Sequence, residues 1–192
     1  SNENLWLLSR KNGPNGEVLR VAHSDLRMQK AEPAIPASND VLDSLVAFKG
    51  GVLVAERAGG VGKLDWLSDS SPAPRAVDLR SLPTGSTIAM LVGDPGGEEA
   101  TFRTESWTTP SVWWAIDVEG RVREVARDAS PATRGFQDVA IERDFCVSSD
   151  GTKVPLTVVH SKQTRRDGAR PTMMIAYGAY GMSYGPFFVP AW

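Results

Sequence analysis

Three strand-turn-strand units that resemble one another recur within the first 125 residues, and they constrain the fold more than any other feature. In each unit, two short runs rich in β-branched, aromatic and other apolar residues flank a turn that contains glycine. The paired runs are residues 5–10 and 17–21, 52–57 and 62–66, and 112–117 and 121–125. They recur at intervals of about 47 and about 60 residues, which is near the period of β-propeller blades.

Further strand candidates lie between these units, at residues 45–48, 87–92 and 100–106. Four short strands per repeat would place about three blades before residue 130, which is an arc of a propeller, because a closed one has typically about four to eight blades. A β-sandwich also consists of short strands with regular turns. The repeats therefore predict a mainly β fold and leave these two architectures open.

The sequence from residue 145 onwards begins with a hairpin signal. Asp150-Gly151 separates the strand-like runs 145–149 and 153–160, and such a pair favours a type I′ turn, in which both central residues have positive φ. Pro155 lacks an N–H group, so the second strand is expected at a sheet edge or at a bulge.

A second kind of strand pattern follows the hairpin. Residues 172–176 are apolar without alternation, which predicts a strand covered on both faces, and residues 177–181 read Tyr-Gly-Ala-Tyr-Gly, where two glycines permit a sharp turn. The order of an edge hairpin, a buried strand and an aromatic glycine turn resembles the start of the hydrolase domain in the prolyl oligopeptidase family. The Ser-x-Asp-Gly-Thr-Lys-x-Pro type of run at 148–155 is part of the same resemblance. The oligopeptidase B branch is favoured, because prolyl oligopeptidase itself has Gly-Phe in place of Ala179-Tyr180.

The resemblance implies a domain organisation. Residues 1–130 would be the C-terminal blades of a β-propeller, and residues 136–192 the first strands of an α/β-hydrolase domain, with the boundary in the polar segment 127–135. Residues 102–111 resemble the last blade of the family's propeller. Because family members are several times longer, we expect a fragment that stops before the catalytic serine and is inactive by itself.

Tyr177 and Tyr180 are the candidate site residues. They follow the expected parallel strand, at the edge where open α/β sheets bind ligands, although by themselves both rings could simply pack beneath the next loop. The resemblance implies that Tyr177 is catalytic and donates its hydroxyl to the oxyanion, and that Tyr180 lines the substrate pocket.

The resemblance also implies a reaction. Short peptides would be hydrolysed by acyl transfer through a Ser-His-Asp triad that lies outside this chain. The alternative is a non-enzymatic β-propeller binding module. A preference for proline or for a basic residue before the cleaved bond stays open.

Other motifs are assigned no catalytic role. Gly181 to Gly185 spells G-x-S-x-G, but Pro186 follows, and no Asp, Glu or His lies after Ser183 to complete a triad. His23 and His160 are expected to be structural or solvent-exposed. The basic loop 162–170 is interpreted as solvated, with docking of an acidic peptide as the alternative.

Composition excludes several function classes. The formal charge is −2, with 21 basic and 23 acidic residues, which argues against a nucleic-acid surface. Histidines, cysteine and carboxylates show no metal-ligand spacing, and a phosphate loop is absent, so we predict no metal and no cofactor. No apolar run approaches the roughly 20 residues of a membrane helix.

Two expectations concern the environment of the chain. Cys146 is the single cysteine, so an internal disulfide is excluded. This favours the reducing cytoplasm as the location of the protein and leaves the periplasm open. We expect Cys146 to be buried among apolar neighbours. An arc of blades ends in unpaired strand edges, so we expect the fragment to self-associate.

Overall fold

The computed structural model describes residues 4–71, 73–83, 85–128, 136–180 and 184–188. Within these ranges the regular structure consists of β-strands and one short 3-10 helix, η1 (Met28–Lys30), and no α-helix is present. In the same ranges no helix is long and apolar enough to cross a membrane.

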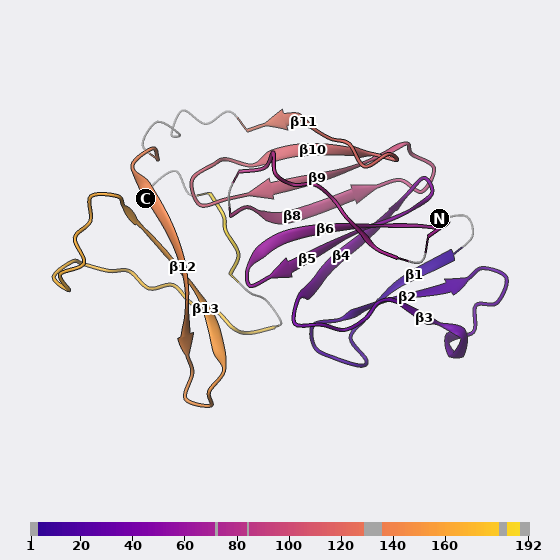
Figure 1. The fold of residues 1–192 in the computed structure, drawn as a ribbon, viewed down its shortest axis with the longest axis horizontal. Helices are drawn as coiled ribbons and strands as arrows, with labels where there is room; N and C mark the ends of the chain where they lie inside the picture. Colours follow the sequence, from indigo (N-terminus) through magenta and orange to yellow (C-terminus); the bar gives the residue numbers. More distant parts are fainter. Residues whose placement is uncertain (1–3, 72, 84, 129–135, 181–183, 189–192) are drawn as a thin grey trace.

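Three antiparallel sheets follow one another along the described part of residues 4–127 (Figure 1). Sheet 1 contains β1 (Asn4–Ser9), β2 (Glu17–Ala22) and β3 (Glu32–Ile35). Sheet 2 contains β4 (Val41–Phe48), β5 (Gly51–Ala58), β6 (Val61–Ser68) and β7 (Arg75–Ala76). Sheet 3 contains β8 (Thr87–Gly93), β9 (Glu99–Glu105), β10 (Val112–Asp117) and β11 (Val122–Arg127). Each sheet pairs its strands in chain order, as propeller blades do, so the partial propeller of about three blades is confirmed and the sandwich alternative is wrong.

Strand β5 is buried on both faces because sheet 2 lies between the other two sheets. Its side chains alternate: Val52 and Val54 pack in a cluster with sheet 1, whereas Leu53 and Ala55 pack in a cluster with sheet 3. This position explains why β5 has a continuous apolar run rather than an alternating one.

Two glycines allow sheets 2 and 3 to approach backbone to backbone. A Cβ atom on Gly62 would lie 2.7 Å from the backbone nitrogen of Ile88, and one on Gly93 would lie 2.5 Å from the carbonyl oxygen of Ala47. Any larger residue at either position would push the two blades apart.

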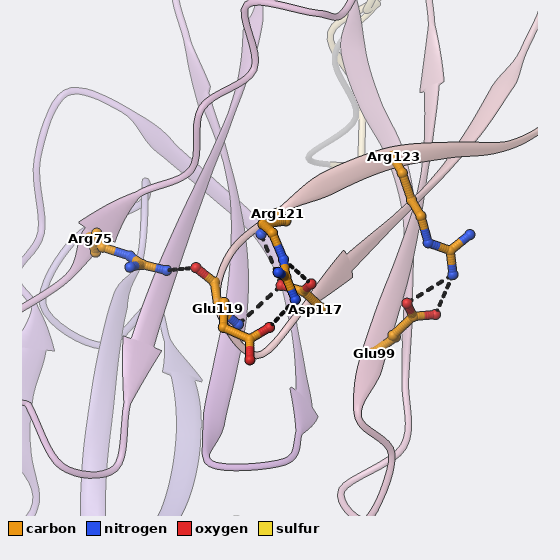
Figure 2. A network of polar contacts seen from close by, with 6 residues as sticks. All are labelled: Arg75, Glu99, Asp117, Glu119, Arg121 and Arg123. Carbon is orange, nitrogen blue, oxygen red and sulfur yellow. Dashed lines mark hydrogen bonds and ion pairs between the residues drawn. The ribbon is translucent and has the colours of Figure 1, made fainter.

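The turn between β10 and β11 is held by a polar network (Figure 2). The carboxylate of Asp117 accepts the backbone N–H groups of Glu119 at 3.0 Å and Arg121 at 2.9 Å, and Arg121 Nε donates to it at 2.7 Å. These bonds, the one from the Arg121 backbone first, lower the pKa of Asp117 to about 2. Arg75 of sheet 2 donates to the Glu119 carbonyl oxygen at 3.0 Å, so the network also links two blades.

The predicted C-terminal hairpin forms as β12 (Val139–Val147) and β13 (Lys153–Ser161), but the predicted type I′ turn is wrong. Gly151 has a φ of 84°, whereas Asp150 is not in the positive-φ region. Ser148 N–H donates to the Thr152 carbonyl oxygen at 2.9 Å, which closes a three-residue loop with Gly151 at the bulge position. Asp150 instead accepts the Thr152 N–H at 3.0 Å, so it avoids the left-handed conformation.

Pro155 lies on an edge, as predicted. It pairs with Phe145, and the described sheet contains β12 and β13 alone. Ser148 and Thr152 form a hydrogen-bonded pair, and hydrogen-bonded and non-hydrogen-bonded pairs alternate along an antiparallel hairpin. By this alternation, Phe145 and Pro155 form a non-hydrogen-bonded pair. The missing N–H therefore belongs to the open side of β13 and removes no ladder bond.

Two predictions about burial are wrong. Residues 172–176 form no strand, and Met173 and Met174 are 70% and 85% exposed. A parallel strand is stable only between neighbours that pair with its backbone, and this segment pairs with none of the described strands. Cys146 is exposed rather than buried, because neither face of the two-stranded hairpin is packed into a described core cluster.

Candidate functional site

A crevice of about 650 Å³ lies where sheets 2 and 3 meet the C-terminal segment. Its volume is within the usual range of ligand pockets, roughly 300–1,000 Å³. Strand ends from one edge of the arc form one wall, and the C-terminal segment forms the other. The lining residues are Asp43, Ser44 and Arg57 from sheet 2, Thr87, Ile88, Ala89 and Glu105 from sheet 3, and Tyr177, Tyr184, Gly185, Pro186 and Phe187.

Two β-bulges shape the propeller wall. The register of β4 against β5 shifts between Leu42 and Ser44, so Asp43 is the extra residue, and the register of β8 against β9 shifts between Ile88 and Met90, so Ala89 is the extra residue. A bulge bends its strand and re-aims a side chain. Both bulged residues line the crevice.

The propeller wall is polar but its charges are paired. Arg57 donates from Nε to an Asp43 carboxylate oxygen at 3.0 Å and from Nη2 to the other oxygen, which is the two-point geometry that guanidinium and carboxylate favour. Glu105 is paired with Arg103 at 2.9 Å and accepts a bond from Ser111 Oγ at 3.4 Å. The wall therefore carries hydrogen-bonding groups with little net charge.

Tyr177 lines the crevice, opposite the propeller wall. Its ring meets the ring of Tyr184 edge to face, with 6.3 Å between centroids, and the residue is 46% exposed. None of the described residues forms a hydrogen bond with its hydroxyl, which can therefore donate to a ligand. The catalytic role of Tyr177 stays a prediction.

Tyr180 does not line the crevice. It is 94% exposed, and its φ of 55° places it in the left-handed region that non-glycine residues rarely adopt. The structure therefore does not bring Tyr180 together with Tyr177 in one cavity of the described chain, and a pocket-lining role for Tyr180 stays a prediction.

Tyr184 and Phe187 are site residues that the sequence interpretation missed. The sequence alone assigns no function to the segment after Ser183, where Pro186 enters only as the residue that follows the G-x-S-x-G motif. The signal was the spacing of aromatic residues around Pro186, which is buried. That pattern fits a short extended segment packed against a wall better than a loop in solvent.

Neither histidine lines the crevice. His23 is exposed, and His160 Nε2 lies 3.0 Å from a Glu142 oxygen, so both fit the predicted structural or solvent-exposed roles. Arg166 first, and then His160, lower the pKa of Glu142 by hydrogen bonding. Ser183 lies outside the described residues. Within the described ranges no group of histidine, cysteine and carboxylate side chains could hold a metal ion.

Comparison with known proteins identifies the family. Residues 1–129 match the family described as "Prolyl oligopeptidase, N-terminal beta-propeller domain". Prolyl endopeptidase from Elizabethkingia meningoseptica is 21% identical over 187 residues, which is 97% of this chain and 26% of that protein. Dipeptidyl aminopeptidase BI from Pseudoxanthomonas mexicana is 31% identical over 148 residues, or 73% of this chain and 19% of that protein.

Solved structures share the fold. Oligopeptidase B from Trypanosoma brucei, with covalently bound antipain, superposes with a TM-score of 0.78 at 23% identity over 99% of this chain and 28% of that chain. A prolyl endopeptidase structure superposes with a TM-score of 0.81 at 22% identity, over 98% and 28% of the two chains. The chain thus spans about a quarter of the length of the relatives it matches. With two thirds of its residues matched to the family's propeller, the chain belongs to the prolyl oligopeptidase family.

Proposed function

We propose that this chain is part of a serine peptidase that hydrolyses short peptides, with Tyr177 as a donor to the oxyanion. The observation that carries the proposal is the position of Tyr177, which lines a peptide-sized crevice between the propeller and the C-terminal segment with its hydroxyl unengaged by the described residues. The nucleophile and its base would come from residues outside this chain.

The chemistry follows from the phenol. Attack of a serine on a peptide carbonyl places negative charge on its oxygen, and a neutral hydroxyl can donate to that oxygen as the charge develops. The ring packing against Tyr184 holds the phenol without consuming its hydroxyl. The propeller wall, with its paired charges at Asp43 and Arg57, lies opposite Tyr177 and would admit only peptide chains narrow enough to enter the crevice.

The peptidase proposal is favoured over a non-enzymatic propeller module by the extent of the similarity. It covers 97% of the chain for a protein named prolyl endopeptidase and therefore continues past the propeller into the C-terminal segment. If the gene encodes residues beyond Trp192, a second G-x-S-x-G after a strand, followed by Asp and then His, would support the peptidase. Their absence there would support the binding module.

The test is Tyr177→Phe in the full-length protein. We expect kcat and kcat/KM to fall together by on the order of 10²-fold to 10³-fold, the loss typical of one oxyanion donor, with KM nearly unchanged. Tyr180→Phe is the matched control and is expected to be mild, because a pocket wall depends on ring area more than on the hydroxyl. A larger kcat loss for Tyr180→Phe than for Tyr177→Phe would refute the role of Tyr177.

A further inference from the structure

Four aromatic side chains form a continuous row from the propeller to Tyr177. Trp107 meets Phe187 with 5.2 Å between ring centroids, Phe187 meets Tyr184 at 5.8 Å, and Tyr184 meets Tyr177 at 6.3 Å. All three separations lie in the range in which aromatic pairs attract one another, about 4.5–7 Å. We call these four residues the aromatic row.

The propeller end of the row is fixed. Trp107 lies in the loop between β9 and β10, and the neighbouring Ser106, which is 2% exposed, accepts the backbone N–H groups of Thr108 at 3.3 Å and Thr109 at 2.8 Å. These bonds are a local side-chain-to-backbone turn that holds the loop in one conformation. The indole ring therefore offers a stationary surface to Phe187.

At the other end of the row, Tyr184 is the ring partner of Tyr177 among the described residues. Tyr177 lies in a segment without strand or helix and is about half exposed, and its ring contact is with Tyr184. An oxyanion donor acts only when its oxygen lies about 2.7–3.1 Å from the developing charge, so its orientation has to be set by neighbouring groups. In the described chain, Tyr184 is the group in place to set it.

We propose that Tyr184 and Phe187 are positioning residues that transmit the fixed location of Trp107 to the ring of Tyr177, so that the propeller helps to orient the oxyanion donor. This inference rests on the proposed function of Tyr177. It assigns to the propeller blade a part in catalysis beyond limiting access to the crevice.

A matched control lies in the same segment. Phe136 and Phe188 form a ring pair with a centroid distance of 5.2 Å and an interplanar angle of 53°, the same values as for Trp107 and Phe187. This pair also tethers the C-terminal segment, but it has no ring contact with Tyr177. Truncating it measures the effect of lost packing alone.

The test uses the full-length protein with a chromogenic peptide substrate. Tyr184→Leu is expected to lower kcat on the order of tenfold with KM changed by less than about twofold, since misplacing a catalytic group acts on the transition state. Tyr184→Phe keeps the ring and should restore kcat, whereas Phe136→Leu should leave kcat within about twofold of the wild type. Trp107→Leu, at the far end of the row, should repeat the kcat loss even where Tyr184→Leu folds poorly.

A double variant separates this inference from the proposed function. If Tyr184 acts through the Tyr177 hydroxyl, then Tyr177→Phe with Tyr184→Leu should be no slower than Tyr177→Phe alone. Fully additive losses, or a Phe136→Leu variant as slow as Tyr184→Leu, would overturn the positioning role while leaving the proposed function intact. A Tyr177→Phe variant with full kcat would overturn both.

Discussion

Glu56 is a buried carboxyl whose ionisation should make the fold weaken as the pH rises. Its side chain is 6% exposed on β5, and its pKa is raised from 4.5 to about 7, first by burial and then by a hydrogen bond with Asp65 and the charge of that residue. Lys63 lies 3.8 Å away and opposes the shift, but Lys63 is itself bonded to Asp40 at 2.6 Å. Burial and Asp65 therefore dominate.

The direction of the effect follows from proton binding. Between pH 4.5 and about 7, Glu56 holds its proton in the folded chain and loses it in the unfolded chain, so stability is fully present below pH 4.5 and falls as the pH rises through this window. One pKa unit corresponds to about 1.4 kcal/mol, so the loss between pH 4 and pH 8 amounts to about 3 kcal/mol. Glu56→Gln keeps a neutral side chain that can donate to Asp65 and should therefore abolish this loss.

The assay is urea unfolding of the 192-residue chain, followed by tryptophan fluorescence at pH 5 and pH 8. We expect Glu56→Gln to unfold within about 1 kcal/mol of wild type at pH 5 and to be more stable by about 2–3 kcal/mol at pH 8. Glu98→Gln, whose carboxyl is 66% exposed beside Lys49, is the control and should show no comparable pH dependence. A Glu56→Gln offset that is equal at both pH values, or that destabilises at pH 8, would refute the reasoning.

Three further predictions concern the isolated chain. Trp114 Nε1 donates to Thr104 Oγ1 at 2.9 Å in the core. Thr104→Val leaves this N–H unpaired and should lower the free energy of unfolding by about 1–3 kcal/mol, measured by urea titration. Adding Trp114→Phe removes the unpaired N–H and should recover part of that loss. A fluorophosphonate probe should not label Ser183; rapid labelling would revive it as a nucleophile. The exposed apolar side chains of β12 and β13 should cause self-association, which light scattering showing a compact monomer would contradict.

Local sequence determined the blades because each is built from neighbours in the chain. Alternating or continuous apolar runs joined by glycine turns pair as soon as they fold back, so the hairpins around residues 12–16, 59–60 and 119–120 could be predicted from their own residues. The hairpin signal at Asp150-Gly151 worked for the same reason. It missed the turn type because Asp150 could satisfy the Thr152 N–H without a positive φ.

Burial at the C-terminal end depended on groups that the local sequence does not specify. Residues 172–176 have the apolar composition of a covered strand, yet they form none, because backbone pairing requires a neighbouring strand and composition cannot supply one. Cys146 is exposed for a related reason, since its strand pairs with one partner and its faces pack into no described core cluster.

The crevice was decided by tertiary structure. The sequence singled out Tyr177 through a motif, but the motif says nothing about Asp43, which is aimed into the crevice by a bulge, or about Trp107, which lies 70 residues before Tyr177 in the chain. Asp43 and Tyr177 line one crevice, and Trp107 contacts Phe187 of its wall, because two blades and the C-terminal segment pack against one another. Contacts between distant segments depend on the shape of the surfaces that meet, which local pattern does not encode, whereas strand and turn formation depend on residues a few positions apart.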